Sequence, residues 1–395
     1  MTKVGVKAVS VEAGSRKRPA VRCVMAKVVD MRVHNVEMPL KKVFMTSNKT
    51  VTASRLVFVN LRTDDGANGW GEAPLNPTFT SETPASAREA LERLADQFVL
   101  GRDADEVVAS APEIGRTLGS RVGARCAMSI ALWDLHARRL GAPLYKLFGG
   151  ARRTSIPVAY HLGSFDAEGD AKEAGEAVAG GFEILKLKVG RADVAEDLEA
   201  VRRIRETVGS GTRLYVDVNQ AWNRDQALAF AQHARRLGVA FVEQPLAQWD
   251  LAGLAQLSAT PGVVFGADES IFDAAQLLAA VSAGTVPGGV VVKALKAGGL
   301  DGVRGLLQLC EVAGIRPFLA GMPGDSSVVS AALLHVAVAA SELPLGTAVA
   351  PHFSREDVVT DPLAVVDGHL HLDAVDGPGL GVQVDVERVE SLTKP

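Results

Sequence analysis

The chain has 395 residues, and a typical domain of about 150 residues suggests two or three domains. Apolar residues make up 47% and charged residues 22%, which excludes a disordered chain, a collagen and a small disulfide scaffold. The net charge of −4 gives no basic field for nucleic acid, and no apolar run reaches the roughly 20 residues that span a bilayer. We therefore expect a cytoplasmic protein with no nucleic-acid or membrane partner.

The first part of the chain is typical of an α+β unit. Residues 1–24 contain no compact apolar signal region, and we interpret them as an extension outside the fold. In residues 25–150, strands are predicted at 26–37, 55–62 and 68–73, and helices after Thr83-Pro84 and over 120–140. Runs of strands followed by runs of helices indicate an α+β domain.

The pattern changes after residue 150. In residues 151–358, short apolar runs alternate with amphipathic stretches, which predicts a (β/α)7-8 TIM-type barrel. The predicted strands are 158–161, 184–188, 214–217, 241–243, 264–268, 290–293, 316–320 and 345–347. A doubly wound open sheet is the rival fold, but no glycine-rich phosphate motif supports it. Residues 359–395 return to turns and short strands, and we expect this C-terminal segment to rejoin the first domain.

Charged residues stand at the ends of four successive strands. Asp217, Glu243, Asp268 and Lys293 are separated by 26, 25 and 25 residues, about one βα unit each. Because the carboxyl ends of barrel strands open on one face, these side chains should converge there. The alternatives are helix caps or solvated turns for single acids, and a structural ion network for the group.

The acidic residues predict a metal site. Three carboxylates without a nearby histidine or cysteine form an oxygen-rich donor set that suits Mg²⁺, with Mn²⁺ as a substitute. Zinc is disfavoured because nitrogen and sulfur ligands are missing.

Two lysines on the second barrel strand indicate the reaction type. Alternation places Lys186 and Lys188 on one face, with Cα atoms about 7 Å apart. At an effective dielectric near 20, their charges repel by about 2.4 kcal/mol, which lowers an amine pKa toward that of a general base. Lys293 would lie across the barrel, so two lysines could remove and return a proton on opposite faces of a carbon. A solvated strand edge is the alternative for the pair alone.

These residues together resemble the enolase superfamily, and within it the muconate-lactonizing subgroup of the mandelate racemase and muconate lactonizing enzymes. The matching segments are KLK at 186–188, DVNQAW at 217–222, EQP at 243–245, DES at 268–270 and KALKAGG at 293–299. Residues 26–150 resemble the capping domain of that family.

The resemblance implies roles for the charged residues. It implies that Asp217, Glu243 and Asp268 bind one Mg²⁺, that Lys188 and Lys293 are the acid/base pair, and that Lys186 supports Lys188. Such a site removes the proton alpha to a substrate carboxylate while the metal stabilises the enolate.

Several reactions are compatible with this chemistry. We expect a racemase or epimerase of an N-substituted amino acid or dipeptide-like substrate, with a muconate-type cycloisomerase as the alternative. A dehydratase, a Schiff-base lyase and a non-catalytic barrel remain as further readings. The partner is a small-molecule carboxylate, and we expect a homo-oligomer.

The resemblance implies that substrate choice depends on two loops of the capping domain, here about 43–50 and 76–83. It also depends on the ends of the last two barrel strands. The TFTSET stretch in the second loop looks like that of dipeptide epimerases. The eighth strand, GTAVAPHF, lacks their Asp-x-Asp and looks closer to the cycloisomerases.

Further polar residues fall near the predicted strand ends. We single out Asn219, Glu269 and Asp325 as neighbours of the metal ligands or of the substrate; for Asp325, capping of the next helix is equally open. We interpret three further residues as structural ones: His161, His335 and Trp222.

Overall fold

The computed structural model describes residues 25–45, 50–164, 166–349 and 351–394. The predicted extension 1–24 and part of the first predicted specificity loop, residues 46–49, lie outside the described residues. Within the described ranges, no helix has the length and apolarity required to cross a bilayer.

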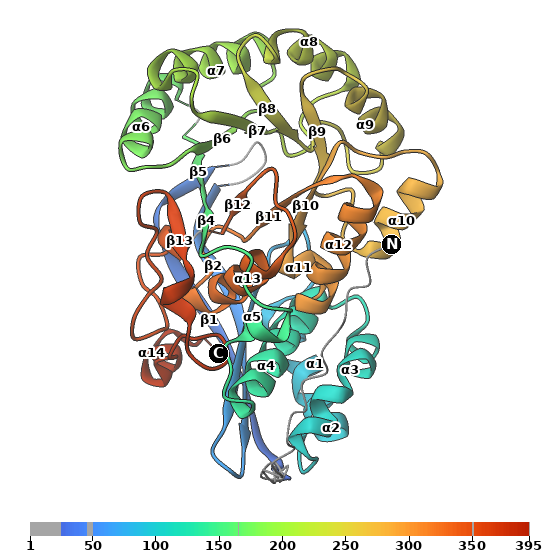
Figure 1. Ribbon diagram of the computed structural model, residues 1–395, viewed down its shortest axis with the longest axis vertical. Helices are drawn as coiled ribbons and strands as arrows, with labels where there is room; N and C mark the ends of the chain where they lie inside the picture. The colour runs from blue at the N-terminus through green and yellow to red at the C-terminus, as the bar shows by residue number, and fades with distance from the viewer. Residues whose placement is uncertain (1–24, 46–49, 165, 350, 395) are drawn as a thin grey trace, which may run out of the picture.

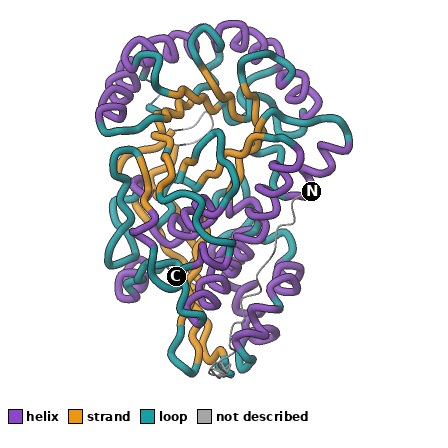
Figure 2. The backbone as a smooth tube through the Cα atoms, viewed as in Figure 1, coloured by secondary structure: helices purple, strands orange, loops and turns teal. Residues whose placement is uncertain are grey.

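Eight parallel strands form the central sheet, which confirms the predicted barrel (Figures 1 and 2). Each end of these strands lies within two residues of the end predicted from the sequence. The strands, in spatial order from one side to the other, are β5 (Ala159–Leu162), β6 (Ile184–Lys188), β7 (Arg213–Asp217), β8 (Val239–Glu243), β9 (Val264–Ala267), β10 (Gly289–Lys293), β11 (Arg316–Ala320) and β12 (Thr347–Ala348). A parallel bridge between Val158 and Thr347 brings the two ends of this order together, so the sheet curls round instead of lying open.

Helices alternate with these strands and surround the sheet (Figure 2). They are α6 (Ala167–Ala179), α7 (Val194–Val208), α8 (Arg224–Ala234), α9 (Leu251–Ser258), α10 (Ala274–Ser282), α11 (Ala294–Ala297), α12 (Leu300–Ala313) and α13 (Ser327–Ala339). Aromatic side chains fill the barrel interior, where Tyr215, Phe241 and Phe318 have ring centroids 5.5–5.8 Å apart. The interior is therefore a packed core, and polar chemistry is confined to the strand ends.

The N-terminal domain consists of a three-stranded antiparallel sheet and a group of helices (Figure 1). Its elements are β1 (Val28–Met45), β2 (Thr50–Thr63), β3 (Asn68–Pro74), α1 (Pro84–Leu94), a π-helical turn (Ala95–Val99), α2 (Ala104–Ala109), α3 (Ala111–Leu118), α4 (Val122–Arg139) and α5 (Leu144–Leu147). Helix α4 packs against β2 and β3. The Thr83-Pro84 start is confirmed, since Thr83 caps α1 in a capping box with Ser86.

The C-terminal segment contacts both parts of the molecule. Strand β13 (His369–His371) pairs with β4 (Ser155–Pro157), and α14 (Val386–Leu392) packs on β1. Two 3₁₀ turns complete this region, Pro351–Phe353 and Leu372–Val375. Near the C-terminus, Val384 forms a single antiparallel bridge with Val359. The division of the chain at residues 150 and 358 stays a prediction.

One buried carboxylate ties this segment to the N-terminal domain. The Asp134 side chain in α4 accepts backbone hydrogen bonds from Trp70 and Leu380, both at 2.8 Å, and pairs with Arg138. Gly379 makes this approach possible, because its φ is +73° and a Cβ there would lie 2.1 Å from the carboxylate.

A second buried carboxylate joins the N-terminal sheet to the barrel. Glu72 of β3 accepts hydrogen bonds from the backbone N–H groups of Ser326 (2.9 Å) and Val329 (3.2 Å) at the start of α13. Asp357 accepts from the backbone and hydroxyl of Ser327 at the same helix end. These bonds satisfy N–H groups that a helix leaves unpaired. They fix the start of α13 relative to β3 and to Asp357.

Burial makes this junction sensitive to pH. Burial and the nearby Asp325 carboxyl raise the pKa of Glu72 to about 8, whereas an unfolded glutamate has a value of 4.5. Between these two values the folded protein holds a proton that the unfolded chain has released. The free energy of unfolding therefore falls as the pH rises from about 4.5 to about 8.

We predict that Glu72→Gln removes much of this decline, because glutamine cannot ionise. Urea denaturation near pH 5 and pH 8.5 should show the variant gaining on the wild type at the higher pH by on the order of a few kcal/mol. Glu113→Gln, at an exposed position of α3, is the control and should keep the wild-type pH dependence. Parallel curves for Glu72→Gln and the wild type would contradict the assignment.

Candidate functional site

Six charged side chains meet at the carboxyl end of the barrel. Asp217, Glu243 and Lys293 are the last residues of β7, β8 and β10, and Asp268 follows β9 directly. Lys186 and Lys188 lie on β6, where Lys188 is in register with Asp217, which in turn is in register with Glu243. All six are at most 7% exposed. The parallel register thus brings together residues that are far apart in the chain.

The carboxylates are paired with the lysines. Lys186 Nζ lies 3.0 Å from Asp217 Oδ2 and 2.6 Å from Glu243 Oε2. Lys188 Nζ donates to the same Asp217 oxygen at 2.6 Å, and Lys293 donates to Asp268 Oδ2. Each of the three acids therefore contacts at least one of these lysines within a buried space.

These pairs determine the protonation of the group. Burial disfavours the charged form of Asp217, but Lys186 and Lys188 outweigh it and hold the pKa of Asp217 well below its usual value. Glu243 behaves differently, because burial and the neighbouring Asp217 raise its pKa to about 8. Glu243 is thus the acid least compensated by the lysines.

The expectation that mutual repulsion lowers the lysine pKa values is wrong for Lys186. Burial does lower the pKa of this ammonium, yet Asp217 and Glu243 raise it above the ordinary value. The pKa of Lys293 is also raised, because Asp268 and Glu243 outweigh burial. The carboxylates on neighbouring strands therefore reverse the predicted direction of the lysine pKa shift. Periodicity alone does not place these carboxylates at contact distance.

The site retains carboxylate oxygens without hydrogen bonds. Among the described residues, Glu243 Oε1 and Glu269 Oε2 are buried and have no hydrogen-bond partner, and Asp268 Oδ1 has only an ion-pair contact. No group of three or more His, Cys, Asp or Glu side chains in the described ranges is already arranged as a metal site. The orphan oxygens nevertheless fit a hard divalent cation, since buried carboxylate oxygens otherwise require donors. Asp217, Glu243 and Asp268 are the residues that could hold it.

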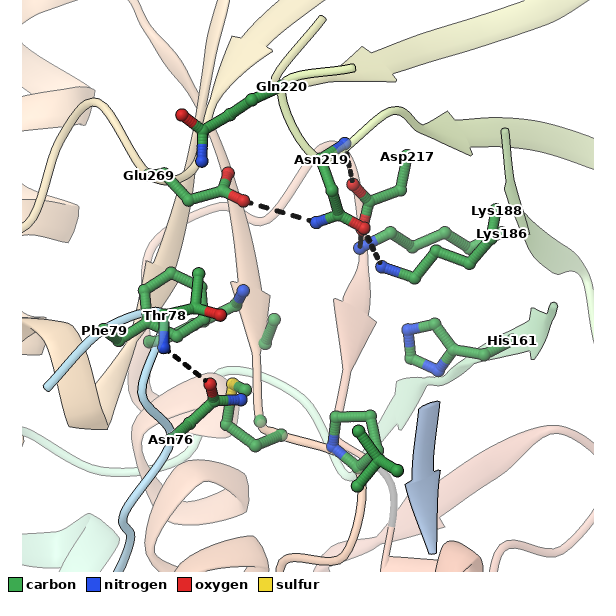
Figure 3. A pocket seen from close by; sticks show the side chains of 16 residues that line it. Asn76, Thr78, Phe79, His161, Lys186, Lys188, Asp217, Asn219, Gln220 and Glu269 are labelled. Atoms are coloured by element: carbon green, nitrogen blue, oxygen red, sulfur yellow. Dashed lines mark hydrogen bonds and ion pairs between the residues drawn. The ribbon is translucent and has the colours of Figure 1, made fainter. Parts of the chain in front are cut away.

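A pocket opens beside these charges (Figure 3). The barrel side of its wall contains Lys186, Lys188, Asp217, Asn219, Gln220, Glu269, Lys293 and His161, and the segment after β11 adds residues 320–323. The N-terminal domain contributes Val51, Asn76, Thr78 and Phe79. The predicted second specificity loop, 76–83, therefore reaches the pocket.

This loop is held in place at both ends. The Asn76 side chain accepts a hydrogen bond from the Thr78 backbone at 2.9 Å, and Glu82 accepts from Gly123 at 2.7 Å and from Ala124 at the start of α4. Between these anchors, the Phe79 ring faces Lys293, whose Nζ lies 4.4 Å from the ring centroid. The capping loop thus contributes a fixed aromatic face next to Lys293.

Asn219 and Glu269 lie beside the charged cluster at the strand ends. Asn219 Oδ1 accepts from Lys188 Nζ at 2.8 Å, and Asn219 Nδ2 donates to Glu269 Oε1 at 3.3 Å (Figure 3). The Asn219 backbone N–H also donates to Asp217 at 3.2 Å. The left-handed backbone of Asn219, with φ of 48°, allows this return toward the strand end.

Asp325 is held by the segment that precedes α13. It accepts a hydrogen bond from the Met322 backbone at 2.7 Å and is not among the residues lining the pocket. The cap of α13 is Ser326, so the helix-cap interpretation of Asp325 is wrong. Burial raises the pKa of Asp325 to about 7.

The three residues interpreted as structural divide into two groups. His335 is fully buried and accepts from the Tyr145 backbone, and Trp222 packs on Phe230 with centroids 4.7 Å apart. His161, in contrast, lines the pocket and its ring points into it (Figure 3). Its position near the end of β5, in register with Lys186, is the sequence feature that could have indicated a place in the pocket.

Two further residues support the site without having been singled out from the sequence. Gln244 Oε1 accepts from the backbone N–H groups of Asp268 and Ser270, at 2.8 and 3.1 Å. The buried ammonium of Lys296 contacts Asp268. Both belong to motifs in which only the neighbouring charged residue had been given a role.

Comparison with known proteins identifies the family. The mandelate racemase/muconate lactonizing enzyme N-terminal domain matches residues 28–149, and the enolase C-terminal domain-like family matches residues 169–389. The L-Ala-D/L-Glu epimerase of Bacillus subtilis is 30% identical over 361 residues, which cover 90% of this chain and 96% of that protein.

Solved structures agree with this match. The muconate lactonizing enzyme of Pseudomonas fluorescens, in complex with muconolactone, has a TM-score of 0.86 at 28% identity, covering 94% of this chain and all of the other. A dipeptide epimerase from Enterococcus faecalis V583, complexed with Mg and the dipeptide L-Leu-L-Tyr, has a TM-score of 0.83 at 28% identity and covers 91% and 99%. The chain therefore belongs to the enolase superfamily, within its mandelate racemase and muconate lactonizing enzyme family.

Proposed function

We propose that this protein is a Mg²⁺-dependent racemase or epimerase that removes the proton alpha to the carboxylate of an N-substituted amino acid or dipeptide-like substrate. One observation carries the proposal: lysines from β6 and β10 border one pocket, with the strand-end acids between them in the sheet order. A stereochemical inversion needs such an arrangement, because the proton leaves from one face and returns to the other.

Asp217, Glu243 and Asp268 would hold the metal. When bound, Mg²⁺ supplies positive charge that stabilises the charge developing on the substrate carboxylate. Support comes from the orphan oxygens of the site and from the epimerase relative whose complex contains Mg. The ammonium groups of Lys186 and Lys188 contact Glu243 and Asp217, two of the same acids.

Lys188 and Lys293 are the acid/base pair in this proposal. Each ammonium Nζ contacts one acid, Asp217 or Asp268, and must give up its proton before it can act as a base. Asp268 raises the pKa of Lys293, so neutralisation of Asp268 by a cation would lower that pKa again and favour the free amine. Lys186 contacts two acids at once, which favours a supporting role.

The pocket favours a substrate without a free ammonium group. The acidic residues in its described wall are Asp217 and Glu269, both on the side of the strand-end acids. The rest of the wall includes the apolar residues Val51, Met322 and Pro323, together with His161. An N-acyl amino acid, whose amide is neutral, suits this wall better than a dipeptide with a charged amino end.

A muconate-type cycloisomerase is the second candidate. The Pseudomonas fluorescens relative in complex with muconolactone favours it, as does the absence of an acidic pair near β12 in the sequence GTAVAPHF. A lactonizing reaction uses the same acids and lysines. It differs in that no alpha proton of an amino acid is exchanged on both faces.

We predict that the two lysines divide the exchange between the two faces of the substrate. In D₂O with Mg²⁺, the wild type should exchange the alpha proton of both enantiomers of its substrate, found by screening N-acyl amino acids, dipeptides, proline derivatives and muconates by NMR. Lys188→Ala should slow the exchange of one enantiomer by about 10²–10⁴-fold, because this variant lacks one base. Lys293→Ala should slow the exchange of the other enantiomer by a similar factor.

Lys172→Ala, at an exposed position of α6, is the matched control and should exchange both enantiomers at the wild-type rate. Exchange of both enantiomers by both site variants would contradict the two-lysine scheme. Turnover of a muconate without exchange of any amino acid derivative would favour the cycloisomerase.

A further inference from the structure

Lys296 is a fourth buried lysine near the strand-end acids. It lies in the short helix α11, and its side chain has no exposed surface. The ammonium donates hydrogen bonds to the carbonyl oxygens of Asp268 (2.6 Å), Ile271 (2.9 Å) and Val291 (2.8 Å). Three backbone carbonyls and the carboxylate of Asp268, 2.7 Å away, therefore surround the buried charge.

The position of Lys296 excludes contact with substrate. It is not among the residues that line the pocket, and the rings of Phe79 and Phe272 lie 6.0 and 5.9 Å from its ammonium. All three N–H bonds of the ammonium are in use. Lys296 is therefore not an acid or base for the reaction, unlike Lys293 three residues earlier.

The contacts of Lys296 converge on one acid. Its Nζ binds the Asp268 carbonyl and lies 2.7 Å from Asp268 Oδ1. The Ile271 carbonyl belongs to the turn after Asp268, and the Val291 carbonyl belongs to the adjacent strand β10. Lys296 thus ties the end of β9 and the following turn to β10.

Gln244 holds the other side of the same peptide unit. Its Oε1 accepts from the Asp268 N–H at 2.8 Å, while Lys296 binds the Asp268 C=O. Both polar backbone groups of Asp268 are therefore held by buried side chains from neighbouring βα units. Such a frame leaves the Asp268 carboxylate little freedom to change direction.

We propose that Lys296 is a positioning residue of the metal site, which fixes Asp268 so that its carboxylate is directed toward the bound cation and thereby strengthens metal binding. The inference rests on the proposed function, in which Asp268 is a metal ligand. Groups that hold the ligands of a metal in place commonly raise its affinity.

The charge of Lys296 acts against this effect but does not cancel it. An ammonium near a divalent cation repels it, and on that ground alone removal of Lys296 would tighten metal binding. Three carbonyl dipoles surround the ammonium, however, and offset much of its field. The loss of orientation should therefore exceed the relief of repulsion.

The test is the affinity of the free enzyme for Mn²⁺, measured by electron paramagnetic resonance without substrate. Lys296→Met keeps an unbranched side chain one atom shorter but removes its donors and charge. We expect the dissociation constant to rise by about 10-fold or more, in line with other supporting residues of metal sites.

Arg205→Met is the matched control. Arg205 of α7 also donates to backbone carbonyls, those of Leu237, Thr212 and Gly238, which lie at the opposite end of β7 and β8 from the site. This variant loses comparable bonds and should keep the wild-type Mn²⁺ affinity. Equal losses in both variants would indicate general destabilisation and overturn the proposal.

Further outcomes are equally decisive. Unchanged or tighter Mn²⁺ binding by Lys296→Met overturns the role of Lys296 and leaves the proposed function standing. Absence of Mn²⁺ binding by the wild type overturns the proposed function itself and the inference with it. If Lys296→Met does not fold, Lys296→Gln, which retains two donors, replaces it; weakened binding supports the inference and wild-type affinity overturns it.

Discussion

The burial of three carboxylates against three ammonium groups is the interaction on which the rest of the structure depends. Removing these charges from water costs several kcal/mol for each ion, and their attraction repays this only with close pairing. Such a cluster is a poor source of stability compared with apolar side chains of the same size. Its place at the carboxyl ends of the barrel strands is where active sites of this fold lie. Asp217, shared by Lys186 and Lys188, is the central member.

The remainder of the molecule holds this cluster and covers it. Two buried acids of the N-terminal domain accept hydrogen bonds from backbone N–H groups at helix starts. Glu72 accepts at the start of α13, and Glu82 accepts at the start of α4. These bonds fix the segment after β11 and the loop with Phe79, which form two sides of the pocket. The walls are therefore built before a substrate binds, which reduces the ordering that binding requires.

Much of the fold and the charged centre could be predicted from the sequence, and the reason is periodicity. Parallel strands recur about every 25 residues, so an acid at each strand end returns to the same face of the barrel. The protonation of Lys186 could not be predicted this way, because it depends on Glu243 at 2.6 Å across two strands. Lys296 escaped notice for a similar reason. A lysine in an apolar helix looks solvated until three carbonyls, two of them from the turn after β9, are placed around it. Asp325 was misjudged because Ser326, one residue later, provides the cap.

The most direct measurement of the central claim is the anomalous scattering of Mn²⁺ in a crystal of the wild-type protein. The account predicts one strong peak per chain, coordinated by carboxylate oxygens of Asp217, Glu243 and Asp268, and its loss in Glu243→Gln. A peak at other residues, or none at a Mn²⁺ concentration that supports alpha-proton exchange, would contradict it.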